Sequence, residues 1–486
     1  MSVAPPERTG RGKSDNGKTS RERTPSNGGH RQSRGAPSAE PANPVLPPPA
    51  GLAVRQVAVH ILDAVLLKRQ PLERALEMQA TWLAPLETRD RGFALTIVRT
   101  VLRRLRFLET VLTKLIERPL PDEAGRVRLI LLVGAAQIAI LETPPHAAVS
   151  LAVDQCQRDR SLRRFDKLAN AVLRRVAETA KSIAADWDPG VGDMPDWLFA
   201  RWRATYGEAT ARRIAAACLE RAALDITVKA DAAHWATQLH ATLLATGSLR
   251  LTESGAIPDL PGFASDAWWV QDAAAALPAR LLGDVAGLNV ADLCAAPGGK
   301  TAQLAAAGAR VTAVDASTGR LKRLAENMAR LNLADRVTVV TAEIETFASP
   351  SPFDAVLLDA PCSATGTIRR HPDILHLKTP EDIARLAALQ TRLLAHAGNL
   401  VKPGGWLIYC TCSLEAEEGP EQIERFLAAN PSFERLPIAP AEVGGLPELV
   451  TPSGDLRTMP FHLPHADPAL AGMDGFFAAR LVKTTA

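Results

Sequence analysis

Apolar residues recur at helical spacing soon after residue 50. They fall on one helix face and are Leu52, Val54, Val57, Ile61 and Val65. Residues 127–141 are almost continuously apolar, which indicates a buried central helix that the following pair of prolines ends. The pattern predicts that residues 49–181 form an all-α domain.

The pattern changes after residue 286 to short apolar runs that alternate with helical segments. Strands are expected at 289–294, 310–315, 336–341, 354–359 and 406–411. Helices are expected at 301–307, 317–332, 379–401 and 415–429. Such alternation is typical of a mostly parallel sheet with helices on both faces. Residues 286–486 are therefore predicted to form an α/β, Rossmann-like domain.

The segment between these parts is mixed. Trp197 to Glu220 has the pattern of a helix, and Asp225 to Lys229 that of a short strand. Pro258 to Phe263 reads as a loop, and Trp268 to Asp272 leads into a helix. Residues 190–285 are predicted to form a small α/β linker domain, which makes the whole chain a multidomain protein.

Charge is distributed unevenly along the chain. Residues 1–48 are rich in Gly, Pro, Ser and Arg, which predicts a disordered basic tail. Residues 51–181 hold 22 Lys or Arg and 14 Asp or Glu, although the whole chain has a net charge of only +3. A basic front part favours a polyanionic partner. The arginine clusters at 103–106 and 158–164 are of a kind that is more often solvated surface than a binding site.

Several classes of protein are disfavoured by composition. No run of eighteen apolar residues without a charge occurs, so we expect no membrane span. The start of the chain has no apolar secretory segment. The six cysteines are scattered, which favours a reducing cytoplasm with free thiols and lacks the spacing of a zinc site.

A glycine-containing loop follows the first predicted strand of the α/β domain. It runs from Asp292 to Thr301 and opens a helix, where free N–H groups favour an anionic group. Its spacing matches neither a dinucleotide fingerprint nor a P-loop, and the carboxylate of S-adenosylmethionine suits it better than a pyrophosphate. Asp315 ends the next strand and could bind ribose hydroxyls, while Glu343 could contact the adenine. A structural turn with a surface aspartate is the alternative.

Two cysteine motifs end later strands at the same predicted sheet edge, Asp359-Ala-Pro-Cys362 and Cys410-Thr-Cys412-Ser. Cytosine C5 is a weak nucleophile, and a thiolate that adds at C6 makes it reactive toward a sulfonium methyl group. Cys412, at a strand end, suits this addition, and a second thiol could assist the later elimination. Asp359 is the natural contact for N3 of the base. Cys156, Cys218 and Cys410 read as buried structural cysteines.

The sequence resembles the RNA cytosine-C5 methyltransferases, in particular the RsmB (Sun or Fmu) branch that modifies bacterial 16S rRNA. The matching strings are DLCAAPGGKT, LLDAPCSATGTIRRHPDI, YCTCSLEAEE and MDGFFAARLVK. In front of them, HAAVSLAVDQC and DKLANAVLRRV resemble the NusB-type RNA-binding domain of RsmB enzymes. The resemblance covers residues 50–485. It implies a NusB-like domain, the linker domain and a class I S-adenosylmethionine-dependent methyltransferase domain.

The resemblance also implies roles for individual residues. Cys412 would be the nucleophile, Cys362 would release the product, and Asp359 would join them as a catalytic residue. Cofactor contacts would be Cys294, Ala295, Ala296, Pro297, Gly298, Gly299, Lys300, Asp315, Glu343 and Asp359. Arg369, Arg370 and Asp373 would lie near the substrate. The family usually has Asp where Glu343 stands and Arg-Val-Asn where residues 227–229 read Thr-Val-Lys.

The expected enzyme methylates C5 of a cytosine in 16S rRNA, at a cytosine-967-type site. Its expected partner is 16S rRNA or a small-subunit precursor, and we expect a cytoplasmic monomer without a metal. The alternatives are a cytosine-C5 methyltransferase of another rRNA or tRNA site and a non-catalytic NusB-like RNA-binding protein. A nicotinamide-dependent dehydrogenase does not fit the loop spacing and leaves the cysteines unexplained.

Overall fold

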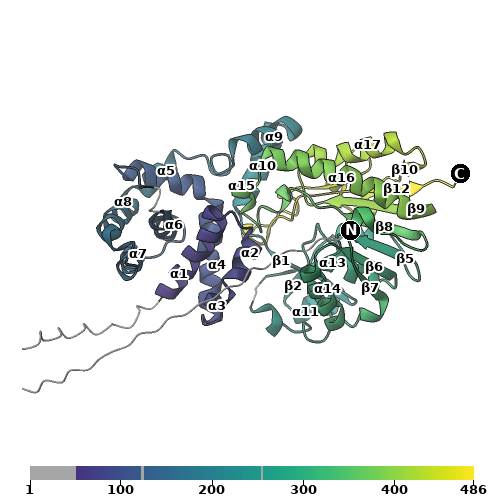
Figure 1. Cartoon of the computed structure of the whole chain (residues 1–486), viewed down its shortest axis with the longest axis horizontal. Helices are drawn as coiled ribbons and strands as arrows, with labels where there is room; N and C mark the ends of the chain where they lie inside the picture. Colours follow the sequence, from purple (N-terminus) through teal and green to yellow (C-terminus); the bar gives the residue numbers. More distant parts are fainter. Residues whose placement is uncertain (1–50, 122–124, 253–254, 486) are drawn as a thin grey trace, which may run out of the picture. The chain divides into compact units, whose positions relative to one another are not determined.

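The structure is a computed structural model of the whole chain and describes residues 51–121, 125–252 and 255–485 (Figure 1). The predicted basic tail, residues 1–48, lies outside the described residues. Among the described helices, none is both long and apolar enough to cross a bilayer. The predicted limits of the three domains stay predictions, since the described residues from 51 onward belong to one compact unit.

The front part is all-helical. Its helices are α1 (Leu52–Leu62), α2 (Leu72–Met78), α3 (Ala80–Leu83), α4 (Thr88–Arg103), α5 (Leu105–Leu115), α6 (Gly125–Ala139), α7 (Pro145–Arg158) and α8 (Asp166–Ala185). A π-helical turn, Asp63–Leu67, follows α1. The apolar run predicted to be central forms α6, which packs against α1, α4, α5, α7 and α8. A helix that is apolar on all of its faces must be buried on all of them, and these five neighbouring helices bury α6.

The single helix predicted from Trp197 to Glu220 is two helices, α9 (Asp196–Tyr206) and α10 (Glu208–Leu219). Gly207 separates them because its φ of 79° lies in the left-handed region, which breaks a right-handed helix. Buried residues of both helices share a core with Ile368, Ile374 and Leu414. The pair therefore packs against the part of the chain that carries the cysteine motifs.

A small antiparallel sheet follows, with the strand order β2-β3-β1-β4. Its strands are β1 (Leu224–Val228), β2 (Ala241–Leu243), β3 (Leu249–Leu251) and β4 (Trp268–Val270), and helix α11 (Ala232–Gln238) lies between β1 and β2. The segment predicted to lead into a helix begins as β4, and the short helix α12 (Leu277–Arg280) comes later. Trp268 is fully buried in the core of this sheet.

The larger sheet has the strand order β10-β12-β9-β8-β5-β6-β7, with β11 paired to β12. Its strands are β5 (Asn289–Leu293), β6 (Arg310–Asp315), β7 (Val337–Thr341), β8 (Phe353–Asp359), β9 (Val401–Thr411), β10 (Phe433–Arg435), β11 (Leu456–Thr458) and β12 (Phe476–Lys483). The run from β9 to β7 is parallel, and β12 is antiparallel to β9. The predicted Rossmann-like fold is confirmed.

Helices cover both faces of this sheet. Residues of α13 (Gly299–Ala306) and α14 (Thr318–Arg330) share a core with one face, and residues of α16 (Pro380–Leu400) and α17 (Pro420–Ala429) share a core with the other. Alternate residues of a strand point to opposite faces, so Leu357 and Leu358 belong to different cores. The chain order reverses beside β5, and ligands of such sheets bind at the strand ends there.

Candidate active site

The glycine-containing loop lies between β5 and α13. Gly298 has a φ of 103°, and a Cβ there would lie 2.9 Å from Cγ of Leu324, so both conformation and space require glycine. Helix α13 begins directly afterwards at Gly299. Its free N–H groups give the end of the loop a partial positive charge. The loop is therefore built to receive an anionic group at close range.

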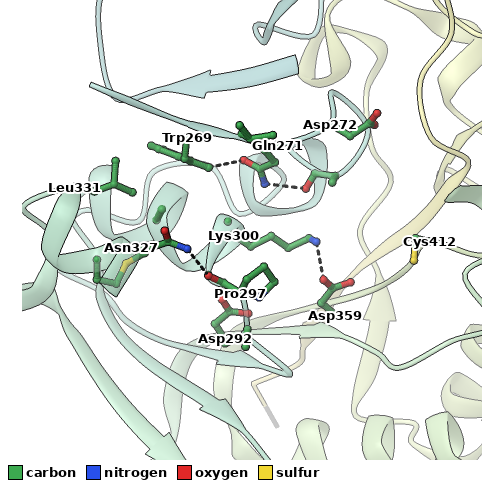
Figure 2. A pocket seen from close by; sticks show the side chains of 18 of the residues that line it. Trp269, Gln271, Asp272, Asp292, Pro297, Lys300, Asn327, Leu331, Asp359 and Cys412 are labelled. Atoms are coloured by element: carbon green, nitrogen blue, oxygen red, sulfur yellow. Dashed lines mark hydrogen bonds and ion pairs between the residues drawn. The ribbon is translucent and has the colours of Figure 1, made fainter. Parts of the chain in front are cut away.

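A cavity of about 380 Å³ opens beside this loop (Figure 2). The residues that line it and were predicted as site residues are Ala295, Ala296, Pro297, Gly298, Gly299, Lys300, Asp359 and Cys412. The small sheet and the segment after it contribute Phe263, Trp269, Val270, Gln271, Asp272 and Ala275. Helix α14 contributes Asn327, Met328 and Arg330. One cavity thus joins the glycine loop, a carboxylate and a cysteine from separate strand ends.

Lys300 and Asp359 form an ion pair inside the cavity, with Nζ and Oδ2 2.7 Å apart. Burial opposes the charge of Lys300, but Asp359, and then Cys410 and Asp292, raise its pKa above the usual value. The Cys410 thiol donates to the other oxygen of Asp359 at 3.5 Å. Because about a third of the Asp359 side chain stays exposed, the held carboxylate can still contact a ligand.

Asp292 lines the cavity at the end of β5 and is fully buried. The Thr301 hydroxyl donates to its Oδ2 at 2.6 Å. Its Oδ1 is buried and has no hydrogen-bond partner within the described part of the chain. Burial raises the pKa of Asp292 to about 7. An unpaired buried oxygen on the cavity wall is a free acceptor for a ligand.

The two motif cysteines touch each other. Sγ of Cys362 lies 3.4 Å from Sγ of Cys412. The hydrogen bond with Cys412, and then burial, raise the pKa of Cys362 well above its usual value. Cys362 therefore keeps its proton, and its S–H can donate to the Cys412 sulfur. Both side chains are half-buried, and Cys412 reaches the cavity.

Glu418 joins the loops that carry the cysteines. Its side chain is fully buried and accepts from the backbone N–H of Ser363 at 2.9 Å and from the Ser413 hydroxyl at 2.5 Å. The Ser363 hydroxyl and the Gln390 amide also donate to it. Each serine directly follows one of the cysteines, so this carboxylate fixes how the two sulfurs meet.

A second ion pair borders the cavity. Arg370 lines it and pairs with Asp474, to which its Nε donates at 3.1 Å. Asp272 accepts from the backbone N–H of Asp474 at 3.1 Å. Burial disfavours the charge on Arg370, but Asp474 and Asp272 raise its pKa. The arginine is therefore a fixed cation beside Cys412.

Three predicted cofactor residues do not line the cavity. The Asp315 carboxylate is turned to its own loops, where it accepts from the N–H groups of Ala296 at 3.2 Å and Ser317 at 2.9 Å. Cys294 is half-buried, and burial raises its pKa. Glu343 is exposed after β7. In this arrangement Asp315 holds the backbone of the glycine loop, and Glu343 is not part of the cavity lining.

Of the three residues predicted to lie near the substrate, Arg370 lines the cavity, and Arg369 and Asp373 do not. Arg369 donates to backbone carbonyls, among them those of Ala471 and Met473, and Asp373 accepts from the N–H of Leu72. Sequence reasoning missed the contributions of Trp269 to Asp272 and of Asp474. The sequence signal for them was position, since β4 ends at Val270 and Asp474 lies within the MDGFF string.

Comparison with known proteins identifies the family. The family model described as 16S rRNA methyltransferase RsmB/F matches residues 280–482, and the NusB family model matches residues 52–178. The ribosomal RNA small subunit methyltransferase B of Xylella fastidiosa (strain Temecula1) is 36% identical over 451 residues, which cover 89% of this chain and 98% of that protein. The chain belongs to the ribosomal RNA small subunit methyltransferase B family. The predicted resemblance and the predicted class of enzyme, a methyltransferase, are confirmed.

Other members of the methyltransferase B family show the same coverage. A probable member from Synechocystis is 33% identical over 456 residues, which cover 89% of this chain and 100% of that protein. Among solved structures, PH0851 has a TM-score of 0.67 at 22% identity and covers 90% of this chain. NSun6 from Pyrococcus horikoshii with SFG has a TM-score of 0.51 at 17% identity and covers 60%. At these identities the two structures support the fold alone.

Proposed function

We propose that this protein transfers the methyl group of S-adenosylmethionine to C5 of a cytosine in 16S rRNA, through a transient bond between Cys412 and C6 of the base. The observation that carries the proposal is the position of Cys412. Its sulfur reaches the cavity of the glycine loop and Asp359 while it touches Cys362. Membership of a family whose relatives are named for small-subunit rRNA supports the substrate.

The residues present fit S-adenosylmethionine. Gly298 has no side chain, so the loop backbone can approach a ligand closely, and the start of α13 can receive the carboxylate of the methionine part. Oδ1 of Asp292, which has no hydrogen-bond partner among the described residues, can accept from an ammonium group. Trp269 and Met328 line the cavity with apolar surface suited to a purine. When bound, S-adenosylmethionine supplies the electrophilic methyl group.

Residues of the chain itself carry out the remaining steps of the reaction. The Cys412 thiolate adds to C6 of the cytosine, and a new S–C bond forms while the ring takes up electron density. As the thiolate adds, N3 takes up a proton through Asp359, and the Lys300 ammonium, whose Nζ lies 2.7 Å from Oδ2, can supply it. After transfer, a water molecule takes the proton from C5, the freed electron pair restores the C5–C6 double bond, and the S–C bond breaks, which returns its own electron pair to Cys412. The Cys362 thiol, 3.4 Å away, donates to the leaving sulfur and eases its release.

Labelled methyl transfer to small-subunit RNA from a strain that lacks the enzyme tests the proposal. We expect Cys412→Ala to abolish transfer while S-adenosylmethionine still binds. Cys362→Ala should accumulate a covalent protein–RNA adduct, seen as a shifted band on a denaturing gel. Cys156→Ala, at a buried cysteine of the helical part, is the control and should keep full transfer. Transfer at the wild-type rate by Cys412→Ala would refute the mechanism.

The target nucleotide is a separate question from the mechanism. Bisulfite sequencing of rRNA from a deletion strain, with and without the restored gene, maps the modified cytosine. We expect a single 16S position, the cytosine-967-type site, to lose its 5-methyl group. Loss at a tRNA or 23S position instead would keep the chemistry and overturn the substrate.

A further inference from the structure

Four arginines gather where helix α4 meets the chain beside the cavity. This arginine cluster consists of Arg99, Arg103, Arg221 and Arg369. Arg99 and Arg103 lie one helical turn apart on α4. Nη2 of Arg103 donates to the carbonyl of Arg369 at 2.6 Å, and Nη2 of Arg369 donates to the carbonyl of Arg221 at 3.3 Å. The contacts bring residues that are far apart in the sequence into one group.

The members of the cluster are not directly paired with a carboxylate within the described ranges, and nearby Asp474 is paired with Arg370. The Nε groups of Arg103 and Arg369 are buried without an acceptor there. Burial, and then the charges of Arg99, Arg369 and Arg221, lower the pKa of Arg103 to about 10. Buried, unpaired like charges are costly, and a bound anion would relieve that cost.

The cluster is reachable and adjoins the active site. Arg369 is buried at 2% exposure, Arg99 and Arg103 are half-buried, and Arg221 is exposed, so the group extends from the interior to solvent. Arg370, the next residue after the buried member, lines the cavity with Cys412. An anion bound here would therefore sit close to a ligand whose reactive part occupies the cavity.

We propose that the accessible members of the arginine cluster, Arg99, Arg103 and Arg221, bind backbone phosphates of the RNA strand next to the base that enters the cavity. This inference rests on the proposed function, because it takes RNA as the substrate. Guanidinium groups suit phosphate oxygens because they can donate two parallel hydrogen bonds. The contacts would hold the strand without reading its sequence, so they would act on binding more than on chemistry.

The test uses Arg99→Gln and Arg221→Gln in the full chain, because neither side chain makes a hydrogen bond within the described residues. With unmodified small-subunit RNA, we expect each variant to raise KM about tenfold and to change kcat less than twofold. The slope of log KM against log salt should fall by about 1 for each arginine, as expected for one lost phosphate contact. The matched control is Arg425→Gln, an exposed arginine paired with Glu421 on α17, which should change neither. Unchanged KM and slope in both cluster variants would overturn the proposal.

A second measurement separates this site from a merely structural role. Without RNA, loss of Arg99 relieves repulsion, so the thermal midpoint of Arg99→Gln should equal or exceed that of the wild type. Gel-shift binding to the same RNA should still weaken about tenfold, whether or not methyl transfer occurs, so failure of the proposed chemistry is distinguishable. If inorganic phosphate stabilises the wild type but not the variant while RNA binding is unchanged, the site takes free anions and the RNA proposal fails.

Discussion

Glu418 offers the sharpest test of how the two cysteines are positioned. Replacing it by alanine removes a fully buried carboxylate that accepts from the Ser363 N–H, two serine hydroxyls and the Gln390 amide. The two hydroxyls lie 3.1 Å apart and can bond to each other afterwards. Gln390 also donates to the Pro361 carbonyl. The Ser363 N–H is left without an acceptor.

The cost follows from these contacts. A hydrogen bond to a charged group contributes about 1.5–3 kcal/mol, and an orphaned buried donor costs about 1–3 kcal/mol. After the hydroxyls re-pair, we expect Glu418→Ala to lose about 4 kcal/mol of unfolding free energy. Glu418→Gln keeps the shape and one acceptor oxygen, so it should lose about 1–2 kcal/mol. Because a misplacement of about 1 Å can slow a reaction about a hundredfold, the alanine variant should form the Cys412 adduct at least about tenfold more slowly.

Denaturant unfolding and single-turnover adduct formation measure the two effects separately. Glu421→Ala is the control, because that residue lies three positions on, is half exposed and pairs only with Arg425 within the described residues. Its unfolding free energy should change by less than about 1 kcal/mol. The reasoning fails if Glu418→Ala is as stable as the control, or if it is destabilised but forms the adduct at the wild-type rate.

Three further changes have defined outcomes. Folding raises the pKa of Asp292 from 3.8 to about 7, so the wild-type protein loses stability as pH rises from 4 to 7. Asp292→Asn lacks this loss, so its thermal midpoint should rise relative to that of the wild type over the same interval, by the equivalent of up to about 4 kcal/mol. Gly366→Ala should cost about 2–4 kcal/mol by denaturant unfolding, since its Cβ would meet the Gly475 backbone at 1.9 Å. Lys300→Met should weaken S-adenosylmethionine binding at least about tenfold by calorimetry, because it leaves the Asp359 carboxylate unpaired.

The strands of the larger sheet could be predicted because buried parallel strands appear as short apolar runs. The predicted strand at 310–315 coincides with β6, and the others differ from the structure mainly at their ends. The strands β2 and β3 could not be predicted in the same way, since each has three residues and mixed polarity. The break at Gly207 was missed because apolar positions continue on both sides of it. A local pattern does not reveal a single left-handed residue.

The candidate site shows the same division. Strand-end reasoning predicted that the glycine loop, Asp359 and Cys412 would lie together, and they line one cavity. The same reasoning could not reveal that the Asp315 side chain turns back to the backbone of its own loop. Glu418 and Asp474 escaped notice because their importance depends on partners up to 202 positions away. Such contacts arise from tertiary packing and leave no periodic pattern.

The contact between the two sulfurs is a consequence of strand register. In the parallel pair of β8 and β9, Asp359 lies opposite Cys410. The N–H of Ala360 then donates to the Cys410 carbonyl, and the N–H of Gly366 donates to the Cys412 carbonyl. Cys412, two residues beyond Cys410, is thereby held beside the turn that carries Cys362.

A slip of one residue would turn every side chain of β9 to the opposite face and separate the thiols. The buried residues Leu407 and Tyr409 on one face, and Ile408 and Cys410 on the other, disfavour that slip. The cores on both faces of the sheet thus fix the geometry that the proposed chemistry requires.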